Sequence, residues 1–182
     1  MVIYMKLTEE TVSSTPIYDG AIIKVKKDIV MLENGQTATR EVVVHGGAVC
    51  VVPVTEDHMV YMVKQYRYPF QRVMIEVPAG KIDQGEDPLT AAHRELEEEI
   101  GMKADEMIDI GEFYPSCAFL TEVIHMYIAK GLTPSKQKLD EDEFLNIEKI
   151  PLTQLCDRIL KDEIKDGKTI ASILKAEKLL QK

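Results

Sequence analysis

Residues 80–102 read GKIDQGEDPLTAAHRELEEEIGM, and the interpretation of the whole chain starts from this stretch. Its second part predicts a helix that begins at Pro88, a residue suited to the first helical position, with Asp87 as the N-terminal cap. Gly101 suits the left-handed residue that follows the last turn. Apolar residues recur at helical spacing and predict one buried face, made by Leu89, Ala92, Leu96 and Ile100.

Three glutamates of this predicted helix stand together on another face. Glu95, Glu98 and Glu99 are spaced i, i+3 and i+4, so their carboxylates lie side by side. Like charges at this spacing repel by roughly 0.2–0.5 kcal/mol per pair. A hard divalent cation with oxygen ligands would reverse that interaction, and Mg²⁺ is the usual choice beside phosphates. The alternative is a solvated acidic helix face, which is typical of a run such as residues 97–99.

The same stretch fills a longer pattern, G-x5-E-x7-R-E-U-x-E-E-x-G-U, in which U is a bulky apolar residue. Its fixed positions are occupied by Gly80, Glu86, Arg94, Glu95, Leu96, Glu98, Glu99, Gly101 and Met102. The stretch therefore resembles the Nudix box without a departure. This resemblance implies an enzyme that hydrolyses, with a bound metal, a diphosphate linked to some other group. We also expect Glu86, in the loop before the helix, to pair with Arg94.

Composition narrows the class of protein. The chain has 182 residues, of which 45% are hydrophobic and 29% charged, which fits one globular domain with a short extension. The net charge of −9 leaves no basic stripe for nucleic acid, and no apolar run approaches the ~18 residues of a membrane span. Residues 1–6 lack the features of a signal peptide. We therefore expect a cytoplasmic protein with no membrane partner.

The three cysteines are Cys50, Cys117 and Cys156, and they lie far apart in the sequence. Without a C-x-x-C spacing they indicate neither a zinc site nor a disulfide framework. We expect each to be a reduced, packed thiol.

Short strands are predicted on both sides of the box helix, over residues 17–25, 39–45, 47–55, 59–66, 73–77, 108–114, 122–129 and 144–150. A turn is expected at residues 33–36 and a hairpin at residues 56–58. Two helices are expected near the C-terminus, the first opening at Pro151 with Leu152, Leu155, Ile159 and Leu160 on one side. The second follows Asp166-Gly167 and carries Ile170, Ile173, Leu174 and Leu179.

This order of elements predicts an α/β fold. With the resemblance, the expected architecture is a Nudix-type α/β/α sandwich with a mixed sheet and an N-terminal antiparallel β extension. Residues 1–45 would form the extension and residues 46–182 the hydrolase domain. The extension has too few strands to bury itself, and the resemblance implies that it joins two chains into a homodimer.

Five flanking segments resemble the ADP-ribose pyrophosphatase branch of the family in order and spacing: residues 40–43, 45–49, 63–67, 76–80 and 139–144. That branch implies hydrolysis of ADP-ribose to AMP and ribose 5-phosphate, with Mg²⁺ or Mn²⁺ as cofactor. The resemblance makes metal ligands of the Ala79 carbonyl and of Glu95, Glu98, Glu99 and Glu143. It assigns catalysis to Glu95, Glu99, Glu141 and Glu143, with Glu141 as the candidate base. It assigns substrate contacts to Arg40, Glu41, Arg67 and Lys81.

Each assignment outside the box has an alternative. Glu141 and Glu143 could belong to a solvated charge run, and Arg40 and Arg67 could be surface arginines in ion pairs. Cys117 and Ala118 stand where the ADP-ribose branch commonly has Pro-Gly. An aromatic residue expected soon after Gly20 is also missing, since residues 21–23 are Ala-Ile-Ile.

A second hypothesis is therefore a pyrophosphatase for another nucleoside diphosphate sugar, such as GDP-mannose. A third is a non-catalytic ligand sensor with the Nudix fold. Such sensors have usually lost glutamates of the box, and this box is complete.

Overall fold

The computed structural model describes residues 6–181, and its compact parts are two units. The first comprises residues 6–46 and 116–122, and the second residues 47–115 and 123–181. Residues 1–5, within which no signal peptide was expected, lie outside the described residues. No helix within residues 6–181 is long and apolar enough to cross a membrane.

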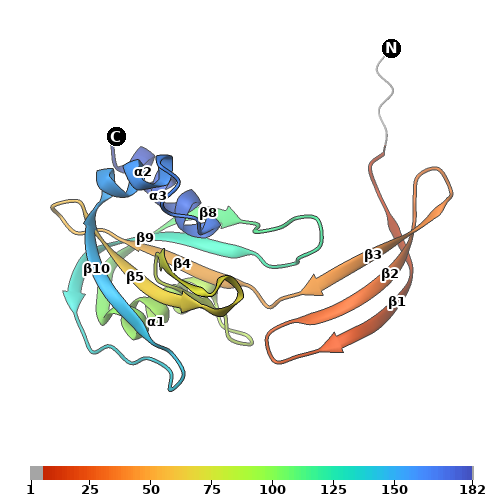
Figure 1. Cartoon of the computed structure of the whole chain (residues 1–182), viewed down its shortest axis with the longest axis horizontal. Helices are drawn as coiled ribbons and strands as arrows, with labels where there is room; N and C mark the ends of the chain where they lie inside the picture. The colour runs from red at the N-terminus through yellow and green to blue at the C-terminus, as the bar shows by residue number, and fades with distance from the viewer. Residues whose placement is uncertain (1–5, 182) are drawn as a thin grey trace, which may run out of the picture. The chain divides into compact units, whose positions relative to one another are not determined.

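The first unit is an antiparallel sheet of β1 (Glu10–Asp19), β2 (Lys24–Met31) and β3 (Thr37–Val44), in that order (Figure 1). The turn predicted at residues 33–36 is confirmed, with Gly35 at φ 79° between β2 and β3. The single strand predicted over residues 17–25 is wrong, because a turn at residues 20–23 separates β1 from β2. All ten residues of β1 are exposed, so no burial alternation marks where that strand ends.

The second unit holds the remaining elements (Figure 1). Its strands are β4 (Ala48–Pro53), β5 (Met59–Arg67), β6 (Arg72–Glu76), β7 (Ala79–Lys81), β8 (Met102–Phe113), β9 (Ile124–Pro134) and β10 (Leu145–Pro151). Its helices are the 3₁₀ turn η1 (Tyr68–Phe70), α1 (Pro88–Ile100), α2 (Leu152–Leu160) and α3 (Gly167–Leu180). One sheet has the order β7-β4-β9-β8, mixed because β4 and β9 are parallel. The other is antiparallel, in the order β10-β5-β6.

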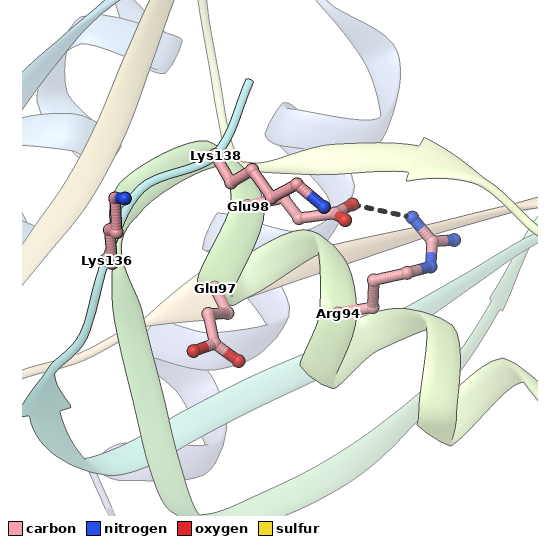
Figure 2. A pocket seen from close by; sticks show the side chains of 5 residues that line it. All are labelled: Arg94, Glu97, Glu98, Lys136 and Lys138. Carbon is pink, nitrogen blue, oxygen red and sulfur yellow. Dashed lines mark hydrogen bonds and ion pairs between the residues drawn. The ribbon is translucent and has the colours of Figure 1, made fainter. Parts of the chain in front are cut away.

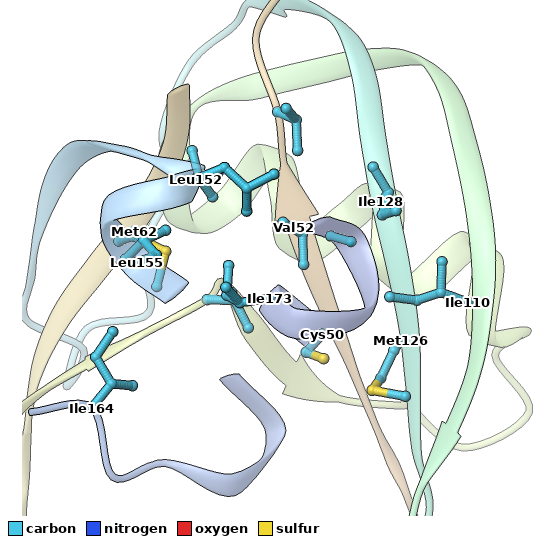
Figure 3. Packing of buried hydrophobic residues seen from close by; sticks show 14 of the residues in the cluster. Cys50, Val52, Met62, Ile110, Met126, Ile128, Leu152, Leu155, Ile164 and Ile173 are labelled. Atoms are coloured by element: carbon cyan, nitrogen blue, oxygen red, sulfur yellow. The ribbon is translucent and has the colours of Figure 1, made fainter. Parts of the chain in front are cut away.

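Strand β4 is the centre of the second unit, and all six of its residues are buried. Successive side chains of a strand point to opposite faces, so β4 contributes to two apolar clusters. Val49 and Val51 pack in the cluster that contains Leu96 of α1. Cys50 and Val52 pack in the cluster that contains α2 and α3 (Figure 3). Helices thus cover both faces of the mixed sheet, and the α/β/α sandwich is confirmed.

The predicted hairpin at residues 56–58 is only partly correct. A tight turn is present, with the backbone N–H of His58 donating to the Thr55 carbonyl at 3.0 Å. However, β4 and β5 share only one bridge, between Val54 and Val60, and then enter different sheets. β4 is fully buried and pairs with β7 and β9 on its two sides, which leaves it no edge for β5.

The buried face of α1 differs from the predicted one. Leu89 is 42% exposed, whereas Ala91, Ala92, Leu96 and Ile100 are buried. The buried stripe is therefore rotated away from Leu89, and it also takes in Glu95 and Glu99. Similar corrections apply to Leu160 of α2 and to Leu174 and Leu179 of α3, which are exposed. The position of the buried stripe brings two carboxylates into the protein interior.

The cysteines lie in three different environments. Cys50 is buried and Cys156 is half-buried, but Cys117 is exposed, so the expectation of a packed thiol is wrong there. Cys117 lies in the loop after β8, where its neighbours are also mostly exposed.

Candidate active site

Helix α1 has the ends that its sequence predicts. The carboxylate of Asp87 accepts a hydrogen bond from the Thr90 backbone N–H at 3.1 Å, and Pro88 is the first helical residue. Gly101 ends the helix at φ 64°, a conformation that a side chain disfavours. A Cβ at Gly101 would also lie 2.9 Å from the Gln137 backbone nitrogen, so the glycine permits a close approach. These caps place the glutamates of α1 on its last two turns.

Strand β7 lies directly against two of these glutamates. The backbone N–H of Ala79 donates to Oε2 of Glu99 at 3.0 Å. A Cβ at Gly80 would overlap the carboxyl group of Glu95, so only glycine leaves room for the strand here. Glu95 is 9% exposed and Glu99 only 3%, which excludes the solvated acidic face for both residues.

Arg94 links the loop before α1 to the helix. Its guanidinium donates to both oxygens of Glu86, at 2.9 and 2.8 Å, which confirms the predicted pair. It also donates to Glu95 at 2.6 Å and to Glu98 at 3.0 Å, and Figure 2 draws the bond to Glu98. Its fifth hydrogen bond goes to the Lys81 carbonyl, at 3.0 Å. The hydrogen bonds from Arg94 and from the Asp83 backbone lower the pKa of Glu86 to about 2.

Burial and mutual repulsion make Glu95 and Glu99 unusual acids. Burial raises the pKa of Glu99 to about 8, and the negative charges of Glu143 and Glu95 add to this effect. Burial likewise raises the pKa of Glu95, against the hydrogen bond from Arg94. Glu143 lies in the acidic loop, which comprises residues 139–143. The Gln65 side-chain amide donates a hydrogen bond to Glu143 at 3.4 Å. The structure thus gathers residues from α1 and from the loop before β10.

The candidate metal donors are the carboxylates of α1 and Glu143, together with the Ala79 carbonyl. In their present conformation, no three His, Cys, Asp or Glu side chains within residues 6–181 are grouped so that they could hold a metal ion. Arg94 instead provides the positive charge for Glu95 and Glu98. Every candidate donor is nevertheless an oxygen, as hard cations require, and Glu95, Glu99 and Glu143 repel one another. The chemistry of the residues therefore suits a divalent cation, provided that Arg94 moves away from Glu95 and Glu98.

A second charged cluster surrounds Glu76, which precedes Ala79 in the chain. Arg67, at the end of β5, donates two hydrogen bonds of 2.7 Å to the carboxylate of Glu76, which is 2% exposed. Lys168 of α3 donates to the same carboxylate and, at 3.0 Å, to Asp166. Burial alone would raise the pKa of Glu76, but Arg67 and Lys168 lower it to about 2. Arg67 is thus held in an ion pair rather than directed freely to solvent.

The other predicted substrate and loop residues belong to β3, β7 and the loop before β10. Arg40 and Glu41 belong to β3 of the first unit, where Arg40 donates to Glu9 at 2.9 Å. Lys81 ends β7 with an exposed side chain. Glu141 is exposed in the turn at residues 141–142.

The segment before the acidic loop is attached to the end of α1. The backbone N–H of Lys138 donates to the Glu98 carbonyl at 3.0 Å, and the Gln137 side chain donates to the Glu99 carbonyl at 2.6 Å. These bonds satisfy carbonyls that a helix end leaves without a partner. A pocket of about 420 Å³ lies here, lined by Arg94, Glu97, Glu98, Lys136 and Lys138 (Figure 2). The hydrogen bonds of Gln137 and Lys138 to the end of α1 fix the position at which the acidic loop starts.

Comparison with known proteins identifies the family. The model of the NUDIX domain matches residues 44–173, which include the whole site on α1. The chain belongs to the Nudix family. A second model, the nucleoside diphosphate sugar hydrolase N-terminal domain, matches residues 9–43.

Individual relatives agree with this assignment. The chain is 41% identical to the methanol dehydrogenase activator of Bacillus methanolicus, over 91% of this chain and 90% of that protein. It is 39% identical to the ADP-ribose pyrophosphatase of Bacillus subtilis, over 92% and 91%. A crystal structure of an ADP compounds hydrolase superposes with a TM-score of 0.87, covering 98% of this chain and 97% of that one. At 19% identity that last match shows the fold alone. The protein is a Nudix hydrolase.

Sequence reasoning missed part of the site. Glu76 lies in a segment that resembles the family, yet no role was expected for it. Asp166 marks only the start of the last predicted helix in the sequence, and Lys168 is a single basic residue of that helix that belongs to no motif. The sequence also gave no reason to expect a role for Gln65, which donates to Glu143. Asp166-Gly167 before an apolar repeat was the available clue, since Asp at that position caps a helix and fixes where Lys168 starts.

The Glu76 cluster predicts a pH dependence of stability. Glu76 has a pKa of about 2 in the folded protein, against an ordinary value of 4.5. Its ionised form therefore stabilises the fold fully above about pH 4.5, and this contribution is lost as the pH falls toward 2. Glu76→Gln should lower the free energy of unfolding at pH 7, and its difference from wild type should shrink by pH 3. Urea unfolding at both pH values measures this. An equal difference at both would contradict the assigned pairing.

Proposed function

We propose that this Nudix hydrolase cleaves the diphosphate of ADP-ribose to AMP and ribose 5-phosphate, with Mg²⁺ or Mn²⁺ as cofactor. The observation that carries the proposal is the burial of Glu95 and Glu99 side by side against Ala79 and Gly80. Two buried carboxylates that repel each other cost free energy, and a bound cation would offset that cost. The ADP-ribose pyrophosphatase of Bacillus subtilis, which matches nearly the whole chain, supports this choice of substrate.

In this proposal the cation is held by oxygens of α1, of β7 and of the loop before β10. Glu95, Glu98 and Glu99 of α1 would bind it together with the Ala79 carbonyl, and Glu143 would complete the set. A bound cation would supply charge neutralisation at the diphosphate oxygens and would lower the pKa of the attacking water. Arg94, now bonded to Glu95 and Glu98, would keep Glu86 as its partner when the cation binds.

The loop and strand residues would act on the water and on the substrate. Glu141 accepts a proton from water as its oxygen attacks the phosphorus that bears the adenosine. The bond from that phosphorus to the bridging oxygen breaks, and its electron pair leaves with ribose 5-phosphate. Arg67 would bind a phosphate through Nη1, because its Nε and Nη2 donate to Glu76. Arg40, Glu41 and Lys81 would contact the remainder of the substrate.

The first test compares two neighbouring glutamates on α1. Glu99→Gln removes a ligand charge at nearly constant volume, and kcat should fall by roughly 100-fold or more, as when one charge-stabilising group is lost. Glu97→Gln is the matched control, because Glu97 pairs with Lys103 and Ser135 on the outer side of the helix. Its kcat should stay near wild type. Steady-state kinetics with Mg²⁺, then with a chelator, measure both. Full turnover by Glu99→Gln would remove the metal assignment.

The second test identifies substrate, products and site of attack together. ADP-ribose and GDP-mannose should be compared in ¹⁸O-labelled water, with products weighed by mass spectrometry. We expect the higher kcat/KM with ADP-ribose, and the label in AMP. Cys117 and Ala118, in place of Pro-Gly, are the reason for including GDP-mannose. A preference for GDP-mannose would change the substrate, and label in the ribose phosphate would move the attack to the other phosphorus.

The same reaction on Glu141→Gln and Glu143→Gln tests the loop. Both should lose more in kcat than they gain in KM, because both act in the transition state. Wild-type rates in both would exclude the loop from the mechanism. No hydrolysis of either substrate by the wild-type protein would favour a ligand sensor.

The third test concerns assembly. We propose that residues 1–45 join two chains into a homodimer and bring Arg40 and Glu41 to the partner's site. A three-stranded sheet needs a buried hydrophobic face for stability, and β1 leaves Val12, Ile17 and Tyr18 exposed. Light scattering at micromolar concentration should give twice the chain mass of 20.6 kDa. Ile17→Glu should reduce this to one chain. A fully active wild-type monomer would contradict the proposal.

A further inference from the structure

The first turn of α3 is bonded to the segment that carries Ala79. Oγ1 of Thr169 accepts a hydrogen bond from the Val77 backbone N–H at 3.0 Å. Nζ of Lys168 donates to the carboxylate of Glu76, the preceding residue. Two adjacent residues of α3 therefore hold two adjacent residues at the end of β6, although about 90 positions separate them in sequence.

Asp166 orients both of these side chains. Its Oδ2 accepts from the Thr169 backbone N–H at 3.0 Å, from the Thr169 hydroxyl at 2.6 Å and from Lys168 Nζ at 3.0 Å. The hydroxyl proton of Thr169 is thus directed to Asp166, which leaves its oxygen to accept from Val77. One carboxylate caps the helix and fixes the directions of the lysine and the threonine.

These contacts are buried, so water does not compete for them. Thr169 is 0% exposed and Glu76 is 2% exposed, and the Lys168 side chain retains 11% of its surface. Loss of one partner would leave a buried polar group unsatisfied, which costs about 1–3 kcal/mol for a neutral group. The geometry of residues 76–77 is therefore tightly set by α3.

The held segment leads directly to the glutamates of α1. The Pro78 carbonyl accepts from the Val51 backbone N–H at 2.9 Å, which attaches the segment to β4. The next residue, Ala79, donates its N–H to Glu99. The positive charges of Lys168 and Arg67 also act on Glu99, although neither residue bonds to it. A contiguous chain of contacts thus runs from α3 through residues 76–79 to the carboxylate.

We infer that Lys168 and Thr169 are positioning residues of the active site, which hold residues 76–79 so that Ala79 meets Glu99 and its carbonyl can serve the cation. The inference rests on the proposed function for the role of that carbonyl. Misplacement of a reacting group by about 1 Å can cost on the order of 100-fold in rate. The first turn of α3 would therefore act on the reaction through residues 76–79.

The experiment uses the full-length protein and one pair of variants at Thr169. Thr169→Val removes the hydroxyl but keeps the shape, whereas Thr169→Ser keeps the hydroxyl. Lys168→Met removes the second contact, and Lys178→Met, on the exposed side of the same helix, is the control. Three quantities are measured: hydrogen exchange of the Ala79 amide without metal, the Kd for Mn²⁺, and kcat and KM for ADP-ribose. Circular dichroism confirms folding, and Thr169→Val carries the test if Lys168→Met does not fold.

Thr169→Val and Lys168→Met should each speed exchange at Ala79 and weaken Mn²⁺ binding by roughly 10- to 100-fold, as for other residues that orient ligands. The variants should lose kcat with little change in KM. Thr169→Ser should recover most of each quantity, and Lys178→Met should match wild type.

Two outcomes overturn the inference in different ways. The first outcome requires that the wild-type protein binds Mn²⁺ and that Thr169→Val is folded. If Ala79 exchange and Mn²⁺ affinity are then unchanged in the variant, α3 only stabilises the fold. Absence of Mn²⁺ binding by the wild-type protein would instead remove the proposed metal site, and the positioning role with it.

Discussion

Burial of two carboxylates on the core-facing side of one helix is the constraint on which this structure depends. Glu95 and Glu99 share the buried stripe of α1 with Leu96 and Ile100. An ionised carboxylate moved from water into a protein costs several kcal/mol unless charges and hydrogen bonds compensate. Arg94 supplies the compensation for Glu95, and the Ala79 backbone N–H supplies part of it for Glu99. The need to compensate buried charge therefore explains why Arg94 and Gly80 occupy their positions in the Nudix box.

The burial of Glu99 also depends on contacts made by α3, on the other face of the mixed sheet. The Ala79 N–H can serve Glu99 only if β7 lies close to α1, which is why a side chain at position 80 would clash. The residues before Ala79 are in turn held by β4 and by the first turn of α3. Compensation remains incomplete, since burial and neighbouring charges still raise the pKa of Glu99 to about 8. An acidic interior of this kind favours a cation, and this is the physical basis of the proposed chemistry.

Local signals predicted the parts of the fold that short stretches of chain control. The caps Asp87 and Gly101 gave the correct ends of α1, because capping depends on the side chain and backbone preference of one residue. The Glu86–Arg94 pair was equally predictable, since the loop is short and the charges are opposite. By contrast, the strand predicted over residues 17–25 failed, because β1 is exposed throughout and its pattern carries no mark of burial.

The sequence by itself determined the family, the chemical type of the donor groups and the helix that bears them. Tertiary structure decided which carboxylates are buried, because the stripe of α1 that faces the sheet depends on packing against β4 rather than on helical spacing. It also decided that β4 and β5 enter different sheets and that Lys168 and Thr169 meet residues 76–77. Contacts between residues some 90 positions apart leave no periodic trace in a single sequence, and only the folded chain brings them together.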